Sequence, residues 1–111
     1  MNRTEKAALV ETLNKTFSES ALVVVTHQVG LTVDEVNQLR GKMRSAGGRY
    51  KVTKNRIARL ALKGTEYESL DALFKGPTAI ATSEDPVAAA KVAVEFANAN
   101  EKLTIVAGAL G

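Results

Sequence analysis

The chain has 111 residues, a net charge of +3 and 45% hydrophobic residues, which suits one domain with a single core. It has no cysteine and one histidine, which excludes disulfides and thiolate chemistry and leaves few residues for metal or cofactor binding, so no cofactor is expected. The chain does not start with the apolar segment of a secretory signal, and no run approaches the ~20 apolar residues of a membrane span, so no membrane contact is expected. The lack of cysteine is compatible with a cytoplasmic protein.

The first half of the chain predicts two helices around a buried strand. Residues 4–18 carry an apolar stripe at helical spacing, with Thr4 as the expected N-cap. The β-branched run 21–27 predicts a central strand. Thr32 and Glu35 have the spacing of a capping box, so a second helix begins at Val33 and ends at Gly47-Gly48.

Residues 49–53 alternate as a strand, with Tyr50 and Val52 facing the core and Arg49, Lys51 and Thr53 facing outward. A third helix is predicted from about Asn55 to Lys63, with Ile57 and Leu60 among its buried residues. Gly64 ends this helix.

The last part of the chain predicts a short helical turn at 70–74, a turn at Gly76-Pro77 and a small apolar strand at 78–82. Asp85 is the expected cap of a helix over 86–99, with Pro86 as its first residue, and 102–108 is the last strand. The gaps between strands hold about 21, 23 and 19 residues, long enough for crossover helices. We therefore expect a single mixed α/β domain over residues 1–111, of order α-β-α-β-α-β-α-β, with a four-stranded sheet in which parallel pairs are favoured.

Basic residues gather in one interval. Between Glu35 and Glu66 there is no acidic residue, whereas nine residues are basic, so the rest of the chain carries a net charge of −6. They are Arg40, Lys42, Arg44, Arg49, Lys51, Lys54, Arg56, Arg59 and Lys63. Because ordinary surfaces mix both signs, this interval predicts an electropositive face that attracts a polyanion.

The junction of the 49–53 strand with the following helix is the expected centre of this face. The N-terminus of a helix binds phosphate through its free N–H groups and its dipole, and Lys54, Asn55 and Arg56 lie there. Asn55 could equally cap the helix. Arg56, Arg59 and Lys63 lie within about 60° of one another around the helix, so they are expected to form one exposed basic stripe.

Other interpretations remain open on the residues alone. The basic residues could be ordinary solvated charges, or a basic adaptor face that binds an acidic protein. His27 ends an apolar strand, where small α/β enzymes often place catalytic residues, and Asp34 or Glu35 could pair with it. Gly30 and Gly76 either allow a partner to approach the backbone or serve as turn glycines.

Five stretches of the chain, covering nearly its whole length, resemble in order the N-terminal domain of the bacterial large-subunit ribosomal protein ten family, which forms the base of the ribosomal stalk. They are GLTVDEVNQLR (30–40), Gly47 to Lys51, VTKNRIARLA (52–61), FKGPTAIA (74–81) and PVAAAKVAVEFANANEKL (86–103). The KN and GPT motifs are the most specific of these.

The resemblance implies a structural, non-catalytic protein that binds large-subunit ribosomal RNA beside ribosomal protein eleven. It also implies that a long C-terminal helix, expected outside these 111 residues, recruits dimers of the acidic stalk protein. The RNA contacts that it implies, together with those expected from the basic face, are Arg3, Lys6, Gly30, Arg49, Lys51, Lys54, Asn55, Arg56, Arg59, Gly76, Pro77 and Thr78.

The chain departs from the family pattern at two places. The segment 27–30 reads His-Gln-Val-Gly, where the family often has an aromatic residue, a basic residue and a glycine. Arg56 stands where threonine is frequent. The first change removes an expected basic contact, and the second adds a charge but removes a hydroxyl.

Overall fold

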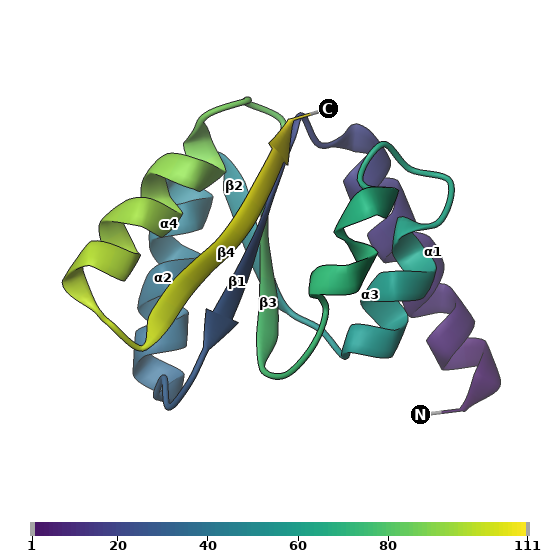
Figure 1. The fold of residues 1–111 in the computed structure, drawn as a ribbon, viewed down its shortest axis with the longest axis horizontal. Helices are drawn as coiled ribbons and strands as arrows, with labels where there is room; N and C mark the ends of the chain where they lie inside the picture. Colours follow the sequence, from purple (N-terminus) through teal and green to yellow (C-terminus); the bar gives the residue numbers. More distant parts are fainter. Residues whose placement is uncertain (1, 111) are drawn as a thin grey trace.

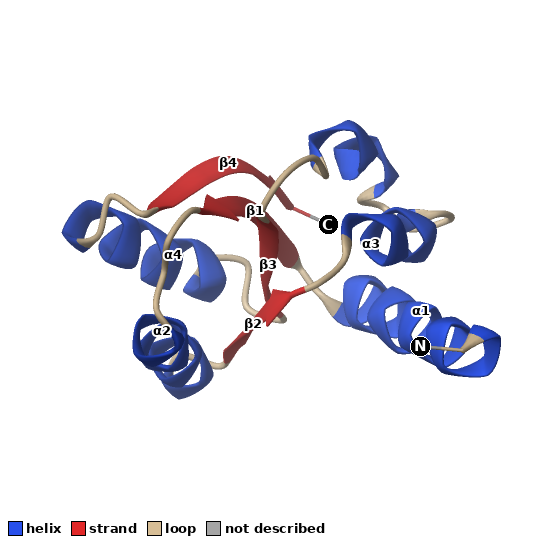
Figure 2. Ribbon diagram, turned by 90° about the horizontal axis from the view of Figure 1, so that it is seen from below, coloured by secondary structure: helices blue, strands red, loops and turns tan. Residues whose placement is uncertain are grey.

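A four-stranded sheet divides the molecule into three layers in the computed structural model (Figure 1), which describes residues 2–110, so the expected domain of residues 1–111 begins and ends outside this range. Helices α2 and α4 cover one face, and α1, α3 and the 3-10 helix η1 cover the other, as the view along the sheet shows (Figure 2). The elements are α1 (Arg3–Glu19), β1 (Leu22–Gln28), α2 (Val33–Ser45), β2 (Gly48–Val52), α3 (Asn55–Leu62), η1 (Glu68–Leu73), β3 (Thr78–Ser83), α4 (Ala88–Ala99) and β4 (Leu103–Leu110). The predicted alternation of helices and strands is confirmed.

The strand order is β2-β3-β1-β4, and every neighbouring pair is antiparallel, so the preference for parallel pairs was wrong. β1 and β2 do run in the same direction, as the crossover through α2 requires, but β3 lies between them. β1 lies in the same way between β3 and β4. The length of a connection constrains the direction of consecutive strands, but it does not say whether another strand is inserted between them.

Each face of the sheet has its own core. Alternate residues of β1 point to opposite faces, so Val23 and Val25 pack with α1, α3 and η1, whereas Leu22 and Val24 pack with α2 and α4. β1 and β3 are the inner strands, and the predicted continuous apolar character of β1 follows from burial on both of its faces.

The helix starts follow local capping rules, with two corrections. The Thr32 capping box is present as predicted. Asn2 caps α1 instead of Thr4, because its side-chain oxygen accepts from the backbone N–H of Glu5 at 2.8 Å. The Asp85 carboxylate accepts from the N–H groups of Val87 and Ala88, so α4 begins at Ala88, two residues later than expected.

Two residues expected in the core are at the surface. Val52 is 47% exposed and Leu60 is 38% exposed, whereas Tyr50 and Ile57 are buried as predicted. Val52 ends β2 at the edge of the sheet, where strand alternation no longer implies that a helix covers the side chain. The buried side of α3 consists of Ile57, Ala58, Ala61 and Leu62, so Leu60 lies at its margin.

Candidate nucleic-acid interface

The junction between β2 and α3, which we call the corner, is formed by Lys54, Asn55 and Arg56. Thr53 and Lys54 link the strand directly to the helix. Lys54 occupies the N-cap position of α3 and no side chain caps the helix, so its first N–H groups are left without the usual side-chain acceptor. Lys54 and Arg56 are exposed on either side of this helix end. The corner therefore combines backbone donors, a helix dipole and two cations.

Asn55 joins the corner to the Gly76-Pro77-Thr78 turn. Its side-chain N–H donates to the Gly76 carbonyl at 3.0 Å, across 21 residues of sequence. The capping role suggested for Asn55 is therefore wrong. Gly76 has a φ of 70°, a left-handed conformation that favours glycine and makes this tight turn possible. The structure thus brings together the KN and GPT motifs, which the sequence could only treat separately.

The loop after β1 lies at the same end of the sheet. The backbone N–H of Gln28 donates to the Pro77 carbonyl at 2.9 Å, and Gly30 follows two residues later with a φ of 76°. The Thr78 side chain is buried, and its hydroxyl donates to the Lys75 carbonyl at 3.1 Å. Within the turn, the Gly76 and Pro77 backbone is therefore more accessible to a ligand than the Thr78 hydroxyl.

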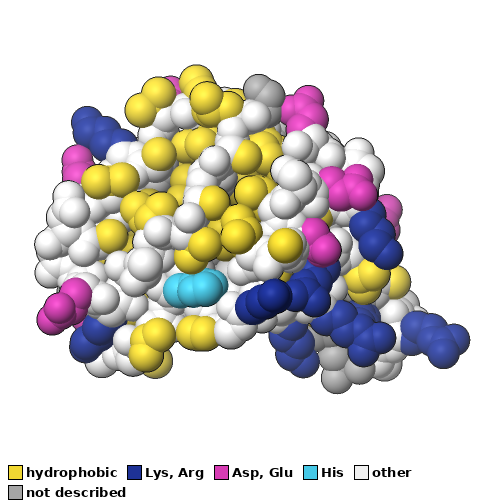
Figure 3. Space-filling model, viewed as in Figure 1, with side chains coloured by type: hydrophobic (Ala, Val, Ile, Leu, Met, Phe, Trp, Pro, Cys, Tyr) yellow, Lys and Arg dark blue, Asp and Glu magenta, His cyan; other side chains and the backbone are white. Residues whose placement is uncertain are grey.

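Arg3 and Lys6, at the start of α1, lie beside α3. Together with Leu60 of α3 they line one shallow pocket, and Leu60 also lines the neighbouring groove that contains Arg56 and Lys63. A patch of Lys and Arg side chains covers the lower ends of α1 and α3 (Figure 3). The predicted basic residues of these two helices therefore form one continuous surface.

Arg59 differs from its neighbours on the predicted stripe. Its guanidinium donates to the Phe74 carbonyl at 2.9 Å, and its Nε lies 4.0 Å from the Asp71 carboxylate. Arg59 thus holds the segment after η1 against α3, so only part of the expected stripe is free to bind a ligand. Lys75 lines the same groove as Arg56 and Lys63. Lys75 was not predicted as a site residue from the sequence, although its position directly before the Gly76 turn was an available indication.

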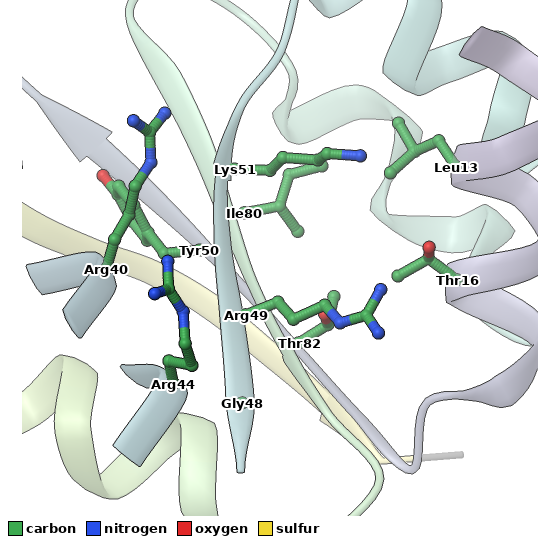
Figure 4. Close-up of a pocket in the computed structure, with 10 residues that line it drawn as sticks. All are labelled: Leu13, Thr16, Arg40, Arg44, Gly48, Arg49, Tyr50, Lys51, Ile80 and Thr82. Atoms are coloured by element: carbon green, nitrogen blue, oxygen red, sulfur yellow. The ribbon is translucent and has the colours of Figure 1, made fainter. Parts of the chain in front are cut away.

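Arg49 and Lys51 lie apart from the corner, on the edge strand β2. They line a cleft of about 440 Å³ that runs along the outer edge of β2, with α1 on one side and α2 on the other, and that we call the edge cleft (Figure 4). Lys51 also lines a smaller pocket with Lys54. The predicted contacts therefore fall into a corner group and an edge group that meet at Lys51.

The surroundings of His27 do not resemble a catalytic site. Its Nε2 is buried without a hydrogen-bond partner among residues 2–110. Glu35, a suggested partner, instead accepts bonds from the backbone of Thr32, the Asn100 amide and Lys102. The Thr32 N–H, above all, and the Lys102 ammonium lower the pKa of Glu35 from 4.5 to about 2, against an opposing effect of desolvation.

Within the described part of the chain, no cluster of three or more His, Asp or Glu side chains is placed to hold a metal ion. No helix among these residues is long and apolar enough to cross a membrane.

Comparison with known proteins identifies the family. A family model described as "Ribosomal protein L10" matches residues 1–98. Proteins called "Large ribosomal subunit protein uL10" are 61% identical over 110 residues in Rhodospirillum centenum and 60% identical over 111 residues in Paramagnetospirillum magneticum. These alignments cover 99% and 100% of this chain but 64% and 65% of the relatives, so the chain spans just under two thirds of their length. The chain belongs to the ribosomal protein L10 family.

Proposed function

We propose that this chain is the ribosomal RNA-binding part of a large-subunit ribosomal protein and that it binds at the base of the stalk. The observation that carries the proposal is the hydrogen bond from Asn55 to Gly76, which unites the helix start and the glycine turn into one basic surface. The names of the relatives indicate that the particle to which the domain belongs is the large ribosomal subunit. The cytoplasmic ribosome is then the place of action.

The corner binds RNA mainly through phosphates. Backbone N–H groups at the start of α3 donate to the oxygens of one phosphate, and Lys54 and Arg56 neutralise it and its neighbours. The Gly76-Pro77 backbone and the Gly30 loop approach the RNA closely, because neither glycine carries a side chain, and Thr78 fixes the shape of the turn. Arg3 and Lys6 extend the surface along α1.

Arg49 and Lys51 add positive potential beside the corner and so strengthen the attraction for RNA. Tyr50, the only aromatic residue in the basic stretch, is buried and offers no face to a base. The surface therefore suits recognition of the backbone and shape of folded RNA, rather than stacking on unpaired bases.

The resemblance to the stalk-base family implies two further partners. We propose that ribosomal protein eleven lies beside this domain on the RNA. We also propose that dimers of the acidic stalk protein bind a C-terminal helix outside these 111 residues. No residue of this chain is assigned to stalk recruitment.

The test is RNA binding by the Lys54→Glu, Arg56→Glu double variant. With a large-subunit RNA fragment from the stalk base, we expect the unmodified chain to show a log–log salt slope of about −3 to −5, as for ~4–6 neutralised phosphates. The double variant should lose binding and keep its thermal midpoint, because both side chains are exposed. Lys15→Glu with Lys91→Glu is the control, since it makes the same charge change elsewhere on exposed helix surface. A flat salt dependence, or equal losses in both double variants, would contradict the proposal.

Two other hypotheses are less well supported. The L10 family is structural and not enzymatic, which argues against catalysis by His27. If the chain is instead a basic adaptor that binds only protein, a complex isolated with it should survive nuclease treatment, whereas an RNA-mediated complex should not.

A further inference from the structure

The outer edge of β2 is a second surface, of which the RNA proposal uses only the positive charges of Arg49 and Lys51. Among residues 2–110, β2 pairs only with β3, so every second residue of Gly48–Val52 directs its N–H and C=O groups away from the sheet. Arg40 and Arg44 project from α2 on one side of this edge, and Arg49 and Lys51 point toward α1 on the other (Figure 4). All four side chains are exposed, and none forms an ion pair within residues 2–110.

The edge cleft on the α1 side has an apolar floor. Leu13 and Ile80, both nearly fully buried, lie at its base with Thr16 and Thr82. Arg49 and Lys51 form its rim, with alkyl chains beside apolar surface and charged ends near solvent. At the Gly47 end the groove continues past Glu19 and Glu84, so its charge changes from positive to negative.

We propose that the edge of β2 binds an extended, acidic segment of a partner protein as an additional strand. A strand supplies both donors and acceptors at regular spacing for the exposed N–H and C=O groups, whereas the phosphate groups of RNA only accept hydrogen bonds. The four cations favour a negatively charged partner, and the apolar floor favours apolar side chains on one face of it. These features together fit polypeptide better than RNA.

The geometry also specifies the pattern of the partner. Side chains of an added strand alternate between the α1 side and the α2 side of the sheet. Apolar residues fit the cleft floored by Leu13 and Ile80, and acidic residues fit the side of Arg40 and Arg44. Glu19 and Glu84 repel further acids at the Gly47 end, so the acidic run stops there. The ligand is therefore a segment of about five residues in which acidic and apolar residues alternate, matching the length of β2.

The probe is a labelled peptide of alternating glutamate and valine, measured by fluorescence anisotropy and by hydrogen exchange of the Gly48–Val52 amides. We expect the peptide to bind and to slow exchange of these amides. Its affinity should fall about tenfold or more in the Arg40→Glu, Arg44→Glu variant. The Lys91→Glu variant is the control and should bind normally. A peptide with N-methyl groups on alternate amides should lose binding, because it cannot complete the strand pairing.

Circular dichroism of each variant separates loss of binding from loss of fold. Arg44→Glu alone provides a milder change if the double variant unfolds. If single-stranded RNA of similar length protects the β2 amides and the peptide does not, the edge belongs to the RNA surface and the proposal fails. It also fails if neither ligand binds, since the charges would then serve only to prevent edge-to-edge aggregation. Because the corner residues stay unchanged in the Arg40 and Arg44 variants, the RNA proposal is judged separately.

Discussion

Arg56 and Arg59 lie three residues apart on α3, and we predict that replacing each by methionine affects a different property: RNA affinity for Arg56 and stability of the fold for Arg59. Arg56 is exposed, so Arg56→Met should weaken RNA binding and make the log–log salt slope shallower by about one unit. Arg59 donates to the Phe74 carbonyl and pairs with Asp71, so Arg59→Met should mainly destabilise the fold. Methionine preserves much of the aliphatic volume of arginine and removes only the charge and the donors.

The size of the Arg59 effect follows from its surroundings. A hydrogen bond to a charged group contributes about 1.5–3 kcal/mol to stability, but the Arg59 side chain is 42% exposed, which reduces that value to about 1 kcal/mol. The ion pair with Asp71 at 4.0 Å, also largely exposed, adds about 0–0.5 kcal/mol. The expected loss is therefore about 1–1.5 kcal/mol, which lowers the thermal midpoint of a domain of this size by roughly 4–8 °C.

Urea and thermal unfolding measure the stability of both variants, and RNA titrations at several salt concentrations measure binding. Asp71→Asn is a useful companion, because it removes the ion pair but leaves the hydrogen bond to Phe74, so its effect should be the smaller one. The reasoning is refuted if Arg59→Met unfolds like the unmodified chain and loses RNA affinity as much as Arg56→Met does. In that case Arg59 would belong to the exposed stripe after all.

Two further predictions concern the scaffold. The pKa of Glu35 is about 2 in the folded chain against 4.5 ordinarily, so its stabilising effect is complete above 4.5 and is lost as pH falls toward 2. Glu35→Gln should therefore have a lower thermal midpoint at neutral pH than the unmodified chain, and it should lose less stability than that chain as pH falls from 4.5 to about 2. An equal loss of stability in both proteins over this pH range would contradict the prediction. Gly41→Ala in α2 meets nothing within 4 Å and should stabilise by about 0.5–1 kcal/mol, whereas Gly48→Ala brings a Cβ within 3.0 Å of the Thr82 carbonyl and should destabilise by about 1–3 kcal/mol. Urea unfolding distinguishes these two changes, and equal effects would show that the backbone at Gly48 adjusts freely.

The elements that the sequence predicted well depend on neighbours in the chain. The Thr32 capping box and the buried run of β1 each follow from a few consecutive residues, and both are confirmed. The antiparallel order depends instead on β3, whose small residues let it pack as an inner strand between β1 and β2. No local pattern marks a strand as inserted, so the crossover lengths alone favoured the wrong pairing.

The same distinction applies to the candidate site. The basic interval and the helix start at Asn55 are local features, and sequence reasoning found them. The hydrogen bond from Asn55 to Gly76 and the one from Arg59 to Phe74 depend on how η1 and the turn return to α3. Helical spacing therefore placed Arg56 and Arg59 on one stripe, but it could not show that one is exposed and the other is engaged by the chain.

The interleaved strand order has a consequence for folding during synthesis. β1 and β2 are complete by residue 52, yet they do not pair with each other, and the consecutive strands that do pair, β2 and β3, are separated by α3 and η1. The first ladder must wait until β3, Thr78–Ser83, leaves the ribosome, when a single strand pairs with both earlier ones at once. Until then the nascent chain exposes a basic segment and an apolar strand without a partner. The arrival of β3 thus sets the moment at which both the sheet and the Asn55–Gly76 contact form.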